Sequence, residues 1–213
     1  MLIIKSQNVN IDRRSQVEYD MNTVFLRNGL MMATIGSACL ASAYQLKVGD
    51  KSPDFSAVSM SGRRLYLKDL QEQGPVFLYF VRDGESPCSQ ETPYIERMLK
   101  SYGATRSNWY GVLNSKDDQV RAFMAEYSPS FRVLKDEDMS MVHALGIRNA
   151  PTVVQIGAHG KVLHVWRGFS GTNLNEMNLA MAKANHQKAS QLDFSQAPST
   201  TIYGVDFQPM IVK

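Results

Sequence analysis

The residue in this sequence best placed to do chemistry is Cys88, in the segment Glu85-Ser86-Pro87-Cys88. A polar loop precedes this segment and a helical pattern follows it, so the sequence predicts a cysteine at the start of a helix. Free backbone N–H groups and the helix dipole stabilise a thiolate there, which lowers the pKa of the thiol and raises its reactivity. The alternative is an inert, buried cysteine. The polar loop favours an accessible and catalytic Cys88.

Four charged side chains bear on the pKa of this thiol. Arg82 and Arg148 are candidates for stabilising a thiolate, whereas Glu85 and Glu91 would oppose one. The sequence alone leaves both outcomes open.

Composition argues against several other functions. The chain has 213 residues, of which 44% are hydrophobic and 20% charged, a mixture typical of a globular protein. Its net charge of +3 comes without a basic run interleaved with aromatic residues, so no nucleic-acid partner is predicted. The four histidines show no metal-ligand spacing with each other or with the two cysteines, so neither a metal site nor another cofactor is expected.

The N-terminal region has the pattern of an export signal. Arg27 is followed by the apolar stretch Leu30–Leu40 and then by Ala41-Ser42-Ala43, the small residues that a signal peptidase reads. The apolar stretch is shorter than the roughly 20 residues that span a bilayer. The sequence therefore predicts a signal peptide over residues 21–43, cut after Ala43, and a periplasmic or secreted protein without stable membrane insertion. A short buried helix is the alternative.

The two cysteines have different expected fates. Residues 1–20 are interpreted as an upstream extension of the reading frame, with Met21 as the true start. A lipid-anchored Cys39 is disfavoured because Gly36, rather than leucine, stands three residues before it. Signal cleavage would remove Cys39 and leave Cys88 as a single thiol, which in an oxidising compartment is either reactive or well buried.

Apolar runs and turn residues predict alternating strands and helices. The expected strands are Ser56–Met60, Arg64–Leu70, Pro75–Val81, Trp109–Leu113, Phe131–Leu134, Thr152–Ile156 and Val162–Trp166. The expected helices are one from Pro87 to Gly103, one capped by Ser115 and Asp118, one over Met139–Leu145 and one over Asn173–Lys183. This alternation predicts a three-layer α/β domain over residues 44–187, followed by an irregular tail over 188–213.

Three further motifs lie along the chain. They are Pro53-Asp54-Phe55, the pair Glu91 and Pro93 after Cys88, and Ala150-Pro151-Thr152-Val153. In this order and spacing they resemble the redoxin, or peroxiredoxin-like, branch of the thioredoxin superfamily (the alkyl hydroperoxide reductase/thiol-specific antioxidant family). They are also similar to the exported thioredoxins of cytochrome c maturation. The resemblance implies a thioredoxin-like fold with a central mixed sheet and an N-terminal β-hairpin extension.

The chain departs from the family patterns around its cysteine. In the exported thioredoxins the motif is Cys-x-x-Cys, and Glu85 stands where the first cysteine would be, so an internal dithiol–disulfide cycle is not available. The peroxiredoxin pattern Pro-x-x-x-Thr-x-x-Cys is also unmet, because Val81 and Glu85 occupy the proline and threonine positions. Arg148 lies two residues from the place of the peroxidase arginine.

The resemblance also implies a cis Ala150–Pro151 bond that faces Cys88 across a groove. Ala150 would then offer backbone groups to a bound peptide. An ordinary trans proline at the start of a strand is the alternative. The predicted supporting residues around Cys88 are Glu85, Ser86, Pro87, Glu91, Ala150 and Pro151.

Two functions follow from these patterns. The first is an exported one-cysteine oxidoreductase or antioxidant enzyme, in which Cys88 attacks a peroxide or a disulfide and an external thiol resolves the product. The second is a binding or adaptor module that has lost the catalytic pair and holds partner chains in the groove beside Pro151. Retention of Cys88 at the family's position favours the enzyme.

Overall fold

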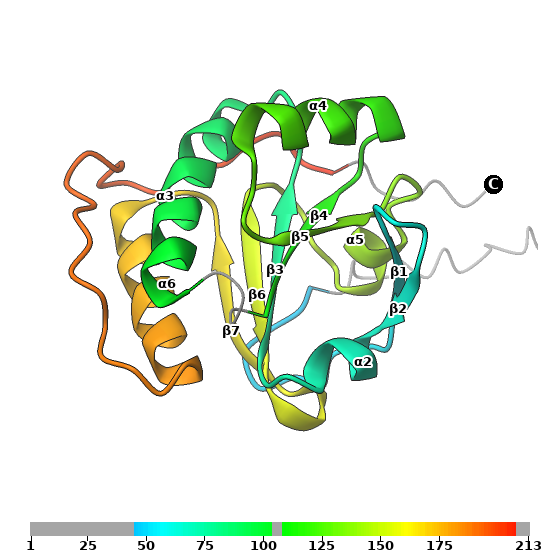
Figure 1. Ribbon diagram of the computed structural model, residues 1–213, viewed down its shortest axis with the longest axis horizontal. Helices are drawn as coiled ribbons and strands as arrows, with labels where there is room; N and C mark the ends of the chain where they lie inside the picture. Colours follow the sequence, from blue (N-terminus) through cyan, green and yellow to red (C-terminus); the bar gives the residue numbers. More distant parts are fainter. Residues whose placement is uncertain (1–44, 104–107, 208–213) are drawn as a thin grey trace, which may run out of the picture. The chain divides into compact units, whose positions relative to one another are not determined.

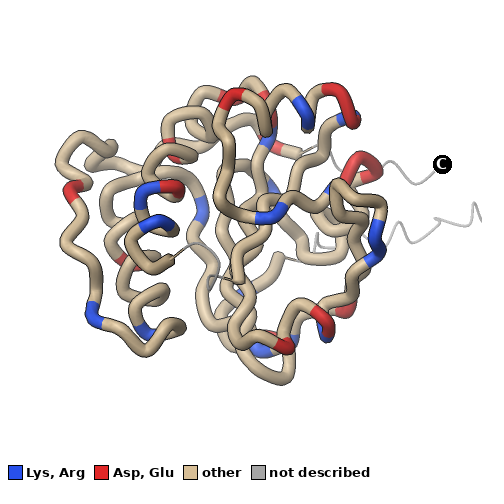
Figure 2. Tube along the Cα trace, in the orientation of Figure 1, with Lys and Arg blue, Asp and Glu red and all other residues tan. Residues whose placement is uncertain are grey.

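A computed structural model describes residues 45–103 and 108–207 of the chain. The predicted signal peptide, the upstream extension and Cys39 lie outside the described residues. Acidic and basic residues are interspersed along the described trace (Figure 2). No helix among the described residues is long and apolar enough to cross a bilayer.

A seven-stranded mixed sheet forms the middle layer, in the strand order β2-β1-β5-β4-β3-β6-β7 (Figure 1). Strands β3, β4 and β5 are parallel, and the other neighbouring pairs are antiparallel. The strands are β1 (Ser56–Ser59), β2 (Arg64–Tyr66), β3 (Val76–Val81), β4 (Trp109–Leu113), β5 (Arg132–Lys135), β6 (Thr152–Ile156) and β7 (Val162–Arg167). The β1–β2 hairpin forms one edge. The predicted thioredoxin-like fold with a mixed sheet and an N-terminal hairpin is confirmed.

Helices cover this sheet. They are α2 (Leu67–Gln71), α3 (Ser86–Tyr102), α4 (Asp117–Tyr127), α5 (Ser140–Ala144) and α6 (Gly171–Ala184), with a 3₁₀ turn η2 (Ala158–Gly160) between β6 and β7. Helices α3 and α6 pack against each other on one side of the sheet (Figure 1), where the Tyr102 hydroxyl donates to Asn178 Oδ1 at 2.6 Å.

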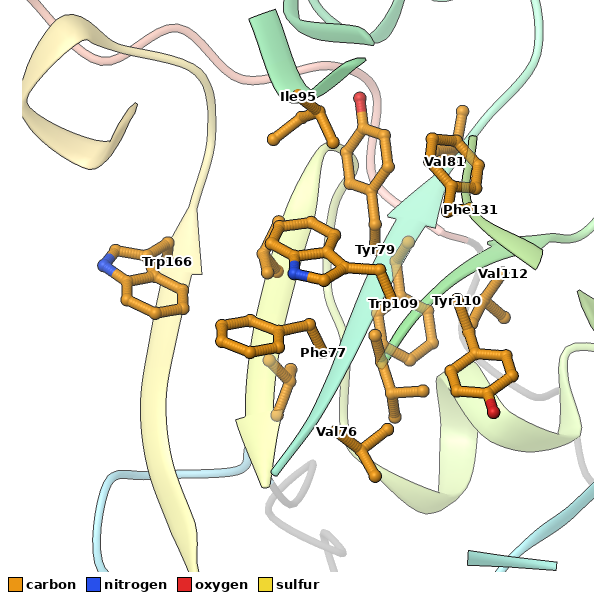
Figure 3. Packing of buried hydrophobic residues seen from close by; sticks show 14 of the residues in the cluster. Val76, Phe77, Tyr79, Val81, Ile95, Trp109, Tyr110, Val112, Phe131 and Trp166 are labelled. Atoms are coloured by element: carbon orange, nitrogen blue, oxygen red, sulfur yellow. The ribbon is translucent and has the colours of Figure 1, made fainter. Parts of the chain in front are cut away.

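The central strand β3 supplies the rigid base of the site. All six of its residues are buried, as expected for a strand covered on both faces. Its Phe77 ring stacks on Trp109 of β4 with centroids 4.8 Å apart, and the rings of Tyr79 and Phe131 form a T-shaped pair with centroids 5.9 Å apart. Figure 3 shows Phe77 and Tyr79 on the side of the strand that faces Ile95 of α3. The end of β3 and the start of α3 are thus held in one packed core.

Several predicted element boundaries differ from the observed ones by a few residues, and two of these differences have a clear physical cause. Only Arg64–Tyr66 of the expected strand Arg64–Leu70 is extended, because the Tyr66 N–H donates to Asp69 Oδ2 at 3.0 Å and starts the helix α2. Leu67 and Leu70, three residues apart, are both buried on that helix. The predicted Ser115/Asp118 cap is also displaced by one residue: Lys116 is the N-cap, and its N–H donates to Gln119 Oε1 at 3.2 Å.

The segment after α6 packs against the domain as irregular chain, drawn in orange to red in Figure 1. Its rings Phe194 and Phe207 are buried. Phe169 and Ile202 exchange both backbone hydrogen bonds, at 2.8 and 3.0 Å. These contacts bring residues from the end of the chain to the carboxyl end of β7.

Candidate active site around Cys88

The start of α3 places Cys88 directly behind the central strand. A short loop from Arg82 connects β3 to Glu85, which is the N-cap of α3 with extended φ and ψ of −84° and 123°. The Glu85 carbonyl accepts from the Ser89 N–H at 3.0 Å, and Pro87 stands in the first turn, where its missing N–H is no loss. Cys88 is therefore the third residue of the helix, as the sequence predicts to within one residue.

Burial of the thiol differs from the expectation. Cys88 is a free cysteine and only 2% exposed. Its carbonyl accepts hydrogen bonds from the Thr92 Oγ1 at 2.8 Å and from the Tyr79 hydroxyl at 3.4 Å, and these two hydroxyls lie 3.2 Å apart. The polar loop before the helix thus does not expose Cys88.

This burial outweighs the decrease in the pKa of the thiol that a position at a helix start favours. Desolvation raises the pKa of Cys88 to about 12, a backbone hydrogen bond from Arg82 lowers it, and the charges of Glu91 and Glu85 raise it further. A helix dipole stabilises a charge at this position by about 0.3–1 kcal/mol. A thiol pKa of about 12, against about 8.5 for a free cysteine, corresponds to roughly 4–5 kcal/mol in the opposite direction. Of the two outcomes that the sequence leaves open, burial therefore favours the thiol over the thiolate that the helix start alone would stabilise, and in this state Cys88 is protonated.

Glu91 is the second buried ionisable group of the site. It is 1% exposed, and neither of its carboxyl oxygens has a hydrogen-bond partner among the described residues. Burial raises the pKa of Glu91 to about 8, a shift that the nearby Tyr79 hydroxyl opposes. Glu91 is consequently mostly neutral at pH 7. A carboxyl group whose pKa lies close to the ambient pH can both give and take a proton.

Tyr79 is the member of the site that the sequence analysis missed. It is fully buried, and desolvation, followed by the charges of Glu91 and Cys88, raises its pKa well above the ordinary value. The only signal was a tyrosine within an otherwise apolar buried strand. A buried phenol needs a hydrogen-bond partner, and a partner on the following helix was the natural candidate.

The two predicted thiolate stabilisers and the predicted supporting residue Ser86 differ in their positions relative to Cys88. Arg82 Nε lies 3.9 Å from Glu85 Oε1, beside the helix start, and Arg82 is among the main influences on the pKa of Cys88. Arg148 is exposed and is not among those influences. Ser86 stands at the surface, where its hydroxyl accepts from Gln90 Nε2 at 2.8 Å.

The second structural element of the site is the loop before β6. The Ala150–Pro151 bond is cis, as the resemblance implies, and both residues are buried. The Ala150 carbonyl accepts from the Gly204 N–H at 2.7 Å. The backbone group that was expected to bind a partner peptide therefore already has a partner within the chain.

No cluster of three or more His, Cys, Asp or Glu residues that could hold a metal ion occurs within 45–103 and 108–207.

Comparison with known proteins identifies the class. A sequence profile of the AhpC/TSA family matches residues 48–165, more than half of the chain. The protein belongs to this family, within the thioredoxin superfamily.

Two relatives and one solved structure show what the chain is similar to within this superfamily. The chain is 25% identical over 159 residues to "Thiol-disulfide oxidoreductase ResA" of Halalkalibacterium halodurans, covering 74% of this chain and 90% of the relative. It is 24% identical over 151 residues to "Peroxiredoxin Bcp" of Escherichia coli, covering 65% and 96%. A crystal structure of a proposed thiol:disulfide interchange protein DsbE from Chlorobium tepidum superposes with a TM-score of 0.59 at 27% identity, covering 66% of this chain and 99% of the other.

Proposed function

We propose that this protein is an exported thiol oxidoreductase that acts through Cys88 and depends on an external thiol. The observation that carries the proposal is that Cys88 and Glu91 are both buried in the first turns of α3, where the charge of Glu91 acts on the pKa of Cys88. A buried carboxyl group whose pKa is raised by desolvation destabilises a fold, so its presence near a buried cysteine supports a catalytic use.

The proposed exchange reaction has two steps. The Cys88 thiol transfers its proton to the carboxylate form of Glu91, and the thiolate sulfur bonds to one sulfur of a substrate disulfide. The substrate S–S bond breaks, and the leaving thiolate takes the proton from Glu91. An external thiolate then attacks the mixed disulfide and releases Cys88, which is reprotonated. The external thiol ends in a new disulfide with one substrate sulfur, and the other substrate sulfur is released as a thiol, with no net change in Cys88. A second external thiol then displaces the remaining substrate sulfur, which completes reduction of the substrate.

Peroxide is the other oxidant that this thiol could use. Attack on the O–O bond would give a Cys88 sulfenic acid and an alcohol or water, and two external thiols would restore the thiol with release of water and a disulfide. The similarity to a peroxiredoxin over 96% of its length supports testing this substrate class.

A binding module remains the second candidate function. Two observations favour it: Glu85 stands in place of an attacking cysteine, and burial raises the pKa of Cys88 to about 12. In that case Cys88 would be inert, and the chain would act by holding partner polypeptides.

Replacing Glu85 by cysteine tests whether the missing first thiol limits disulfide exchange. The variant is made in a Cys39→Ser background so that no other thiol contributes. Glu85→Cys restores Cys-x-x-Cys, and we expect disulfide exchange on insulin with glutathione to rise at least tenfold, because an intramolecular thiol has a high effective concentration. Glu85→Ser is the matched control: it removes the carboxylate without adding a thiol.

The parent activity should be lost in Cys88→Ser with both insulin and hydrogen peroxide as substrates. Equal turnover by the parent and Cys88→Ser would leave the binding module as the function of this chain.

Export rests on the signal pattern at Arg27, Leu30–Leu40 and Ala41-Ser42-Ala43. We expect the protein isolated from its native cells to begin at Tyr44, because the peptidase cuts after Ala43. Mass spectrometry of its N-terminal peptide checks this. Recovery of residues 21–43 on the cell-derived protein would contradict export by cleavage.

A further inference from the structure

The end of the described chain lies along the loop that precedes β6. The Gly204 N–H donates to the Ala150 carbonyl at 2.7 Å, and the Phe207 N–H donates to the Arg148 carbonyl at 2.6 Å. Asn149 and Asp206 form an antiparallel bridge between these two bonds. Residues 203–207, here called the tail segment, therefore pair with residues 148–150 as a short added strand.

The same tail segment contacts the loop and helix start on the Cys88 side of the site. The Arg82 Nη1 donates to the Asp206 carbonyl at 3.1 Å, and the Val205 N–H donates to Glu85 Oε2 at 3.4 Å. Glu85 occupies the position of the missing first cysteine. The tail segment thus bridges the two elements between which a substrate chain would bind.

The contact is made by backbone rather than by side chains. A Cβ atom at Gly204 would lie 2.7 Å from the Ala150 carbonyl oxygen and 3.4 Å from Glu85 Oε2, so the close approach requires glycine. The side chains of Tyr203 and Val205 point to solvent, with 55% and 58% of their surfaces exposed. Pairing of this type, in which main-chain hydrogen bonds supply the affinity, is how extended peptides add to an exposed edge.

We infer that the tail segment is a built-in occupant of this edge, to which the family resemblance assigns a bound peptide, and that it must leave before a partner polypeptide can pair antiparallel to residues 148–150. A tethered segment is present at an effective concentration in the millimolar range, so it competes strongly with a free chain. The apparent affinity for a partner falls by the fraction of molecules in which the edge is free. The inference rests on the proposed function only for the nature of the partner, which would carry the disulfide; the occupancy itself does not need Cys88.

The test uses the tail's own sequence as the probe. A fluorescent peptide with residues 199–207 (Ser-Thr-Thr-Ile-Tyr-Gly-Val-Asp-Phe) is titrated with the full chain in a Cys39→Ser/Cys88→Ser background, and binding is read by anisotropy. Gly204→Val should displace the tail segment, because its side chain would overlap the Ala150 carbonyl. We expect this variant to bind the peptide at least tenfold more tightly than the parent.

Two controls define the site. Val205→Ala removes an exposed side chain from the same segment and should bind like the parent. A probe peptide carrying valine in place of its glycine should not bind Gly204→Val, because it would meet the same carbonyl.

A second variant keeps the test informative if Gly204→Val does not fold. Phe207→Ala removes the buried ring at the far end of the tail segment, and it should also increase peptide binding. Hydrogen exchange of the Gly204 amide should accelerate at least tenfold in this variant. If the parent and both variants bind the peptide equally, or none binds it, the inference is overturned, whatever the redox assays show. Conversely, an inactive Cys88 with tail-dependent peptide binding would overturn only the proposed enzyme.

Discussion

Cys88 of the folded protein is expected to react with iodoacetamide about three thousandfold more slowly at pH 7.5 than a free cysteine. Burial raises the pKa of Cys88 to about 12, against about 8.5 for an unburied thiol, and only the thiolate is alkylated. Because the pKa is raised, the thiolate fraction increases tenfold per pH unit, without a plateau near pH 8.5. The measurement is the rate of alkylation from pH 7 to pH 10.5 in a Cys39→Ser background.

The same protein in concentrated guanidinium chloride is the control for this experiment. Unfolding removes the desolvation, so the rate should then level off near the ordinary thiol pKa of about 8.5. A plateau at or below that pH in the folded protein would contradict the burial argument and would restore the thiolate that the helix start alone predicts.

The slow alkylation expected for Cys88 and the pairing of the tail segment with residues 148–150 belong to the same resting state of the protein. Cys88 is buried and protonated, and the tail segment holds the backbone of Ala150 and the carboxylate of Glu85. A protein with an unpaired cysteine gains from such protection, because an exposed thiolate is readily converted to sulfenic acid and beyond. On this view, the binding of a partner opens the site before the thiol reacts.

The sequence predicts most of the strands, helices and turns of the fold, because the signals for them are local. The apolar run of β3, the glycine that ends α3 and the turn between β6 and β7 are each encoded within a few residues. The cis bond at Ala150–Pro151 follows from the family resemblance rather than from residue spacing.

The electrostatics of the site depend on contacts that no local pattern reveals. Cys88 is buried although the loop before it is polar. The Tyr79 hydroxyl on β3 donates to the backbone carbonyl of Cys88 on α3, a contact between the sheet and the helix layer. The partner of Ala150 comes from Gly204, more than 50 positions later in the chain. A helix dipole could be anticipated from sequence, but the larger desolvation of the thiol could not.

Glu91→Gln is expected to stabilise the folded protein at pH 8 by several kcal/mol. Burial raises the pKa of Glu91 to about 8, whereas an unfolded glutamate titrates near 4.3. Between these values the folded state holds a proton that the unfolded state has released, so the parent loses stability as the pH rises from about 4.3 to 8. The full window corresponds to roughly 3–5 kcal/mol. Glutamine does not ionise, so the stability of Glu91→Gln should not decrease with pH in this way.

Guanidinium unfolding at pH 5 and pH 8 measures the effect, which by calorimetry should appear as a Tm increase of about 10 °C at the higher pH. Glu137→Gln, at an exposed position, is the control and should change stability little at either pH. The difference between Glu91→Gln and the parent must grow with pH, because ionisation of the buried carboxyl is its cause. A gain that is equal at both pH values would instead assign it to packing. A loss at pH 8 would show that the Glu91 carboxylate has a stabilising partner in the folded protein.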